Sequence, residues 1–391
     1  MYMLCDEKRV YVHTDYRVEA YDKESLVKGE EVRLLWKSGK LTEDLSKLVN
    51  SKDYIYGIGK NLFVRVSKID ASTETLTISD DLVDLSCTYR EIYLLGKTGL
   101  FRIPVEKFSP AEIKRITVSE LMEKPFRCLC VSDDYVYVAS ESYLYKLERN
   151  GGKVGEKALA GVRILVMSEE GPVAVRDDGK VLNMSEDMEV TSAGEFDGKP
   201  IKAEYNVYHT FLLTVTGLHI FGKAGGRIAH ISDSSYLSFS EGLNHLYLYK
   251  KEGLQVASKA DILGDNYQKI DLTTLSAIVF ASLMLFEREK GSKVSIKEKR
   301  GLLDVRSDER NIQMEKLVFR LSKYFPEIFV LFSNPGYYES LLEYGKRFEL
   351  IKGEGDRITL NTDMLDHILK KHSTFKTFQE DIPSLVSSCI S

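Results

Sequence analysis

The chain has 391 residues, of which 43% are apolar and 29% are charged, and its formal net charge is −5. This size and apolar content are sufficient for one large or two smaller units with buried cores. The nearly balanced charge excludes a general electrostatic attraction to nucleic acid or to an anionic membrane. The five cysteines are widely spaced, which argues against a disulfide framework and favours a reducing compartment. The opening MYMLCDEKRV is charged too early for a signal peptide. We therefore expect an intracellular protein of the nucleus or cytoplasm.

One short pattern occurs seven times in the first 272 residues. Each copy has an apolar strand, a tight turn and a second strand, as in EIYLLGKTGLFRIPV at 91–105. The first strand of each copy carries one anchor residue, and the seven anchors are Tyr11, Tyr56, Tyr93, Tyr137, Ala174, Phe211 and Tyr247. Successive anchors are 45, 37, 44, 37, 37 and 36 residues apart. The spacing predicts a repeated supersecondary unit.

Each hairpin is flanked by an apolar segment before it and a more polar one after it. Four short strands with a period of about 40 residues are typical of a β-propeller blade. One thin sheet cannot bury both faces, but a ring of sheets buries them between neighbours. A sandwich or a solenoid fits this regular unit less well. The sequence therefore predicts a mainly β fold, with a seven-bladed propeller over residues 1–272.

The two ends of this region indicate how the ring closes. Residues 1–5 suit the innermost strand of the first blade, and residues 267–272 suit the outermost strand of the seventh. If both assignments hold, each blade is made from consecutive strands, and the ring closes without strand exchange.

The repeats resemble highly divergent WD-repeat propellers in period and strand order, although the Trp-Asp and Gly-His motifs are missing. A narrower resemblance occurs in HTFLLTVTGLHIFGKAGGRI at 209–228. There Thr214, Gly217, Gly222 and Gly225 match a repeat of the chromosome-condensation-regulator propellers, whereas Phe221 replaces the family's Trp. The first resemblance implies a surface for binding proteins. The second implies guanine-nucleotide exchange on a small GTPase.

The remaining residues, 273–391, are predicted to form a helical C-terminal domain. A first helix begins at Thr273 or Thr274 and ends at Gly291. Its apolar run, 275–286, is shorter than the roughly 20 residues that cross a bilayer, so we expect no membrane span. The helix is apolar on nearly every side, so its surface must be buried by the propeller, by later helices or by a partner. We expect partner proteins to dock on it, at Ile278, Val279, Leu283 and Phe286.

The rest of this domain follows a mixed pattern. Residues 291–301 are basic and are expected to form a linker, and a helix is expected over 309–331, ended or kinked by Pro326. A short helix, two strands around a Gly-rich turn and another helix then follow, so that about 309–373 resembles a winged helix. That resemblance implies contact with DNA or RNA, or with protein alone as in many winged helices of large complexes. The candidate residues for nucleic-acid contact are Lys346, Arg347, Lys352 and Arg357. The 18 basic and 18 acidic residues of 271–391 leave no overall cationic footprint.

The sequence contains no catalytic, cofactor-binding or metal-binding motif that we recognise. Cys128 and Cys130 form C-x-C without two further ligands nearby, and small packing residues explain them better than zinc. We therefore expect a non-enzymatic scaffold, a subunit of a multiprotein complex. A regulator that binds DNA or RNA and a guanine-nucleotide exchange factor are the alternatives.

Overall fold

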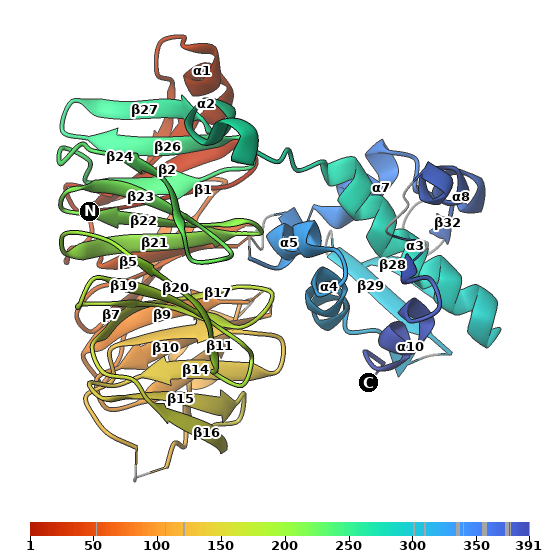
Figure 1. Cartoon of the computed structure of the whole chain (residues 1–391), viewed down its shortest axis with the longest axis horizontal. Helices are drawn as coiled ribbons and strands as arrows, with labels where there is room; N and C mark the ends of the chain where they lie inside the picture. The colour runs from red at the N-terminus through yellow and green to blue at the C-terminus, as the bar shows by residue number, and fades with distance from the viewer. Residues whose placement is uncertain are drawn as a thin grey trace. The chain divides into compact units, whose positions relative to one another are not determined.

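A computed structural model describes residues 1–390 except 52, 89, 106, 120–121, 300–301, 309, 334–336, 339, 354–357, 372–374 and 376. The chain divides into two compact units, Met1–Lys269 and Ile270–Ser391. Figure 1 shows the helices and strands of each unit.

The first unit consists of seven antiparallel sheets made from consecutive strands, and each sheet is one blade (Figure 1). Blades 1 to 3 contain β1 (Tyr2–Cys5), β2 (Arg9–Thr14), β3 (Arg17–Asp22) and β4 (Leu34–Lys37); β5 (Lys47–Asn50), β6 (Tyr54–Ile58), β7 (Leu62–Ser67) and β8 (Thr73–Thr77); and β9 (Leu82–Cys87), β10 (Glu91–Gly96), β11 (Leu100–Pro104) and β12 (Lys114–Ile116). A short helix, α1 (Lys23–Lys28), connects β3 to β4, and a 3₁₀ turn, η1 (Pro110–Glu112), precedes β12.

The other four blades follow the same order. They contain β13 (Cys128–Val131), β14 (Tyr135–Ala139), β15 (Tyr143–Glu148) and β16 (Lys153–Ala158); β17 (Val162–Met167), β18 (Pro172–Arg176), β19 (Lys180–Met184) and β20 (Val190–Glu195); β21 (Pro200–Asn206), β22 (His209–Thr214), β23 (Gly217–Gly222) and β24 (Arg227–Ile231); and β25 (Ser238–Glu241), β26 (His245–Lys250) and β27 (Gly253–Ser258). The predicted seven-bladed propeller is confirmed.

The innermost strands close into a ring. Each one packs beside the innermost strand of the next blade, and β25 packs beside β1. At this junction Met3 and Val12 of blade 1 share an apolar cluster with Phe239 and Leu246 of blade 7. The buried Lys202 ammonium of blade 6 also donates hydrogen bonds to the carbonyl oxygens of Met3, at 2.5 Å, and Phe239, at 2.6 Å. The ring therefore closes through packing and hydrogen bonds, without an exchanged strand.

Blade 7 corrects one prediction, because its sheet has three strands instead of four. After β27 the chain forms α2 (Lys259–Leu263) and the 3₁₀ turn η2 (Gly264–Asn266), and residues 267–271 are irregular. The Tyr267 hydroxyl donates a hydrogen bond to Asn244, at the turn between β25 and β26. Tyr267 is thus held at that turn, and none of residues 267–272 pairs with β27.

The second unit begins with α3 (Leu272–Lys290), whose N-cap is Asp271 instead of the predicted threonine. The predicted linker is wrong: β28 (Val294–Lys299) and β29 (Leu302–Ser307) pair as an antiparallel hairpin, to which β30 (Arg310–Asn311) adds. The predicted second helix is divided near Pro326. The remaining elements are α4 (Met314–Ser322), η3 (Pro326–Ile328), α5 (Phe329–Ser333), α7 (Leu341–Arg347), β31 (Ile351–Lys352), β32 (Thr359–Leu360), α8 (Thr362–Lys371) and α10 (Ile382–Ser387).

Candidate functional site

A regular contact between neighbouring blades sets the frame for the site. All seven anchor residues are buried. The residue twelve positions after an anchor belongs to the segment that follows the third strand of the same blade. In five blades this residue is basic, and the five are Lys23, Lys68, Arg149, Lys223 and Lys259. This second recurring position was not predicted, although the twelve-residue spacing is readable in the sequence.

Three of these basic residues lie over the anchor ring of the preceding blade. The Nζ atom lies 5.3 Å from the Tyr11 ring centroid for Lys68 and 5.4 Å from that of Phe211 for Lys259. Lys23 of blade 1 lies 5.0 Å from the Tyr247 ring centroid of blade 7. The closing interface therefore uses the same cation–π contact as two interior interfaces.

Other anchors use their hydroxyl groups. The Tyr56 hydroxyl donates to the carbonyl of Val105 in blade 3, at 2.7 Å, and the Tyr137 hydroxyl donates to that of Glu186 in blade 5, at 2.9 Å. Both acceptors lie twelve residues after an anchor, where other blades have the basic residue. A side chain or a carbonyl at this position thus joins each of these blades to the one before it.

Blade 5 departs from the pattern at both positions, since its anchor is Ala174 and Glu186 replaces the basic residue. Lys223 of blade 6 has no aromatic ring to cover and instead forms an ion pair with the buried Glu169 carboxylate. The Tyr205 hydroxyl also donates to Glu169, at 2.8 Å. Burial raises the pKa of Glu169, an effect that Lys223 partly opposes. Departures from a regular pattern often mark functional sites, so the interface of blades 5 and 6 becomes the candidate.

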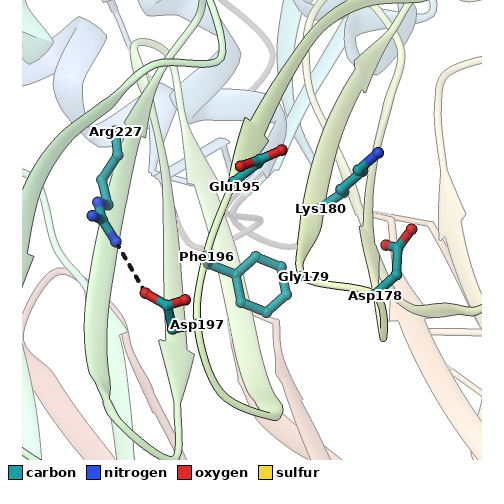
Figure 2. Close-up of a pocket in the computed structure, with 7 residues that line it drawn as sticks. All are labelled: Asp178, Gly179, Lys180, Glu195, Phe196, Asp197 and Arg227. Atoms are coloured by element: carbon teal, nitrogen blue, oxygen red, sulfur yellow. Dashed lines mark ion pairs between the residues drawn. The ribbon is translucent and has the colours of Figure 1, made fainter.

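A polar cleft of about 320 Å³ opens at this interface (Figure 2). Its lining residues come from the turn before β19, the end of β20 with the segment after it, and the start of β24, and they are Asp178, Gly179, Lys180, Glu195, Phe196, Asp197 and Arg227. In Figure 2 the Asp197–Arg227 pair lies on one side of the Phe196 ring, and Asp178 and Lys180 lie on the other. The buried Phe196 belongs to the apolar cluster between the two blades, and this packing fixes the position of its ring in the cleft. The charged groups are mostly exposed.

The Arg227 guanidinium is positioned by contacts on two sides. It lies 3.8 Å from the Asp197 carboxylate and 3.5 Å from Nδ1 of the buried His219. Burial lowers the pKa of His219 to about 4, so the ring is neutral at pH 7 and Nδ1 accepts from Arg227. Nε2 then carries the proton and donates to the Thr214 hydroxyl, at 3.1 Å. The His230 ring stacks on His219 at a centroid distance of 4.3 Å.

The charged side chains that line the cleft are suited to forming ion pairs with a ligand. Its lining presents an ammonium, a guanidinium and three carboxylates, but no hydroxyl, thiol or imidazole. No group of three or more metal-ligating side chains occurs among the residues that the structure describes. Burial raises the pKa of the Cys128 and Cys130 thiols, which are packed between blades 4 and 5.

The four residues expected to bind partners are buried inside the second unit. Ile278, Val279, Leu283 and Phe286 are each at most 2% exposed, and α3 packs against α7, α8, α10 and β28. These elements supply the cover that the apolar helix needs. The physical reason for expecting a partner at this helix is thereby removed.

The residues expected to contact nucleic acid form no free cationic cluster among the described residues. Lys346 forms an ion pair with Glu298, at 2.9 Å, and Arg347 lies over the Phe348 ring. Lys352 is exposed on β31, and Arg357 lies outside the described residues. The order α7, β31, β32, α8 matches the predicted helix, hairpin and helix. Among the described helices, none has the length and apolar content to cross a membrane.

A protein of Aquifex aeolicus (strain VF5), described as uncharacterized, is 40% identical over 384 residues, or 98% of this chain and 96% of the relative. The chain belongs to the same family as that protein. No profile of a known protein family matches the sequence. The WD40 domain of Neurospora crassa Pan2 is similar in structure, with a TM-score of 0.51 and 12% identity, covering 64% of this chain and 85% of that one. The computationally designed Ika8 protein has a TM-score of 0.50 and 10% identity, covering 66% and 95%. These likenesses show the propeller fold alone.

Proposed function

We propose that the chain is a non-enzymatic scaffold that binds a partner protein through the cleft between blades 5 and 6. The observation that carries this proposal is the coincidence of two features. The one interface whose anchor residue is not aromatic, that of Ala174 in blade 5 with Lys223 in blade 6, also has the cleft lined by exposed charges of both signs. Such a surface suits salt bridges to a partner, which favour specificity and rapid association.

The cleft lining has no hydroxyl, thiol or imidazole, and its charged groups are exposed, which supports binding over catalysis. Nucleophilic catalysis needs a nucleophile and a base within hydrogen-bond reach. The His219 imidazole, which contacts Arg227, is buried and is already bonded on both ring nitrogens. It therefore acts as a support for the guanidinium.

The proposal is tested by isolating the tagged chain from its source organism and comparing two double variants. Lys180→Glu with Arg227→Glu reverses both cations of the cleft. The matched control, Lys153→Glu with Lys157→Glu, reverses two cations on β16 of blade 4. We expect the wild type and the control to recover a partner in stoichiometric amount. The cleft variant should recover at least tenfold less of that partner. Equal recovery with both variants, or a chain that is always isolated alone, would contradict the proposal.

Nucleic-acid binding is a second candidate, favoured by the order helix, hairpin and helix in the second unit. If it operates, binding to duplex DNA or RNA weakens steeply with salt. Reversing the charges of Lys346, Arg347, Lys352 and Arg357 should then abolish it. Binding that survives this change would exclude these residues as the contact.

A further inference from the structure

Blade 7 leaves one strand position of the propeller vacant. Six blades have an outermost strand of three to six residues that pairs antiparallel with the third strand, whereas β27 is the last strand of its sheet. The irregular segment that follows η2 is bonded at Asn244 and does not reach this edge. An unpaired strand edge presents a row of backbone donors and acceptors to any extended chain.

The hydrogen-bond register identifies the free groups of β27. The Lys259 amide donates to the Asn244 carbonyl, which makes this a hydrogen-bonded pair of the antiparallel ladder. Such pairs alternate, so Gly253, Gln255 and Ala257 direct their backbone groups to β26. Leu254 and Val256 direct theirs to the open edge, where no strand in the described part of the chain meets them.

An apolar surface of the neighbouring blade lies next to this edge. Helix α1 of blade 1 packs against β27 and buries Leu26 in the cluster shared with blade 7. The same helix, the segment after it and the start of β4 expose four large apolar side chains, at 42% for Val27, 44% for Val32, 40% for Leu34 and 36% for Leu35. A hydrogen bond from the Arg33 amide to the Ser25 hydroxyl, at 3.4 Å, ties that segment to α1.

We propose that an extended segment of a partner protein occupies this position as the fourth strand of blade 7. The inference rests on the proposed scaffold function, to which it adds a second contact. The segment pairs antiparallel with β27 through Leu254 and Val256, and it places apolar side chains against Val27 and Val32. This is β-strand addition, in which backbone hydrogen bonds provide affinity and neighbouring side chains provide specificity.

A partner fits the position better than a second copy of this chain. Every other described strand of the propeller is held in its own sheet, so the propeller of a copy has no unpaired strand to insert at this position. Pairing two β27 edges would cover the backbone groups but would leave the apolar side chains on blade 1 exposed. A separate extended segment covers both.

Hydrogen–deuterium exchange of the full chain, alone and in the complex isolated from the source organism, tests the proposal. We expect amides of β27 to exchange at least tenfold more slowly in the complex, and amides of β8 to exchange at unchanged rates. Val256→Pro removes one donor from the open edge and should reduce partner recovery at least tenfold. The matched control is Thr75→Pro, which removes an outward donor from the outer strand of the complete blade 2.

The outcomes separate this inference from the scaffold function. If a partner is recovered but β27 exchanges as fast as in the free chain, the fourth-strand assignment is overturned and the scaffold function stands. If no partner is recovered, both fail. If β27 is protected only by self-association, seen as a concentration-dependent dimer, the occupant is a second copy and the proposal is wrong. If Val256→Pro does not fold, the exchange rates of the wild-type complex decide.

Discussion

The stability of the ring depends on single polar groups where neighbouring blades meet. Asp6, in the turn between β1 and β2, accepts from the Tyr11 hydroxyl at 2.7 Å and lies 2.9 Å from the Lys68 ammonium of blade 2. Burial alone would raise the pKa of Asp6, but Lys68 and the hydrogen bonds lower it to about 2. A buried carboxylate held in this way stabilises the folded state as long as it remains ionised.

The Asp6 interaction predicts a pH dependence of stability. Because the folded pKa is about 2 and lies below the unfolded value of about 3.9, the contribution is complete above pH 4 and is lost as the pH falls toward 2. We expect Asp6→Asn to lower the free energy of unfolding by about 2 kcal/mol at pH 7 and by progressively less below pH 4. This difference in the free energy of unfolding is measured by guanidinium denaturation at each pH, followed by Trp36 fluorescence. A deficit that is constant from pH 7 to pH 3 would contradict the prediction.

Replacing a tyrosine anchor with phenylalanine is predicted to affect stability differently at two positions. Tyr56→Phe leaves the buried Val105 carbonyl without its partner and should cost about 1–2 kcal/mol. The Tyr247 hydroxyl is buried and has no partner among the described residues, so Tyr247→Phe should cost nothing or stabilise slightly. Unfolding midpoints of the two variants under one condition provide the comparison. Equal losses would show that these hydroxyl contacts do not distinguish the blades.

At the scale of single elements, the sequence pattern located the strands and the apolar helix, but it did not show what covers that helix. The alternating pattern of the hairpins identified all seven anchors, because a strand between two blades must bury residues on both faces. An all-round apolar helix has two equivalent explanations, a partner or a cover from its own chain, and the pattern of α3 cannot distinguish them. The cover is formed by distant segments such as α8 and α10, whose positions depend on the tertiary fold.

Helix α3 is therefore predicted to respond as a core element. Leu283 is fully buried, so Leu283→Ala should destabilise the second unit by about 2–5 kcal/mol. Recovery of the partner through the propeller should not change while that unit remains folded. Thermal unfolding followed by circular dichroism measures the stability of the variant, and the amount of partner recovered with it measures binding. Unchanged stability with complete loss of the partner would restore α3 as a docking surface.

At the scale of the whole molecule, a period near 40 residues was enough to predict seven blades, because thin sheets gain a core only between neighbours. It did not reveal that blade 7 lacks its outer strand, since a polar edge strand and an irregular segment have similar composition. The candidate cleft was also missed, because Lys180 and Arg227 lie 47 positions apart and meet only across two blades. The exchange-factor function of the narrower resemblance stays a prediction, to be tested by nucleotide release from small GTPases.

Closure of the ring is tested most directly by electron–electron distances between spin labels on one rim. The turns between the second and third strands of all blades lie on that rim, and each offers an exposed residue. One label replaces Tyr16 of blade 1, and the second replaces in turn Lys60, Lys97, Glu141, Asp178, Val215 and Lys251. For a closed ring the distance from blade 1 rises to a maximum at blades 4 and 5. It then falls at blade 7 to about the value measured for blade 2. A distance that keeps increasing to blade 7 would contradict the closed propeller.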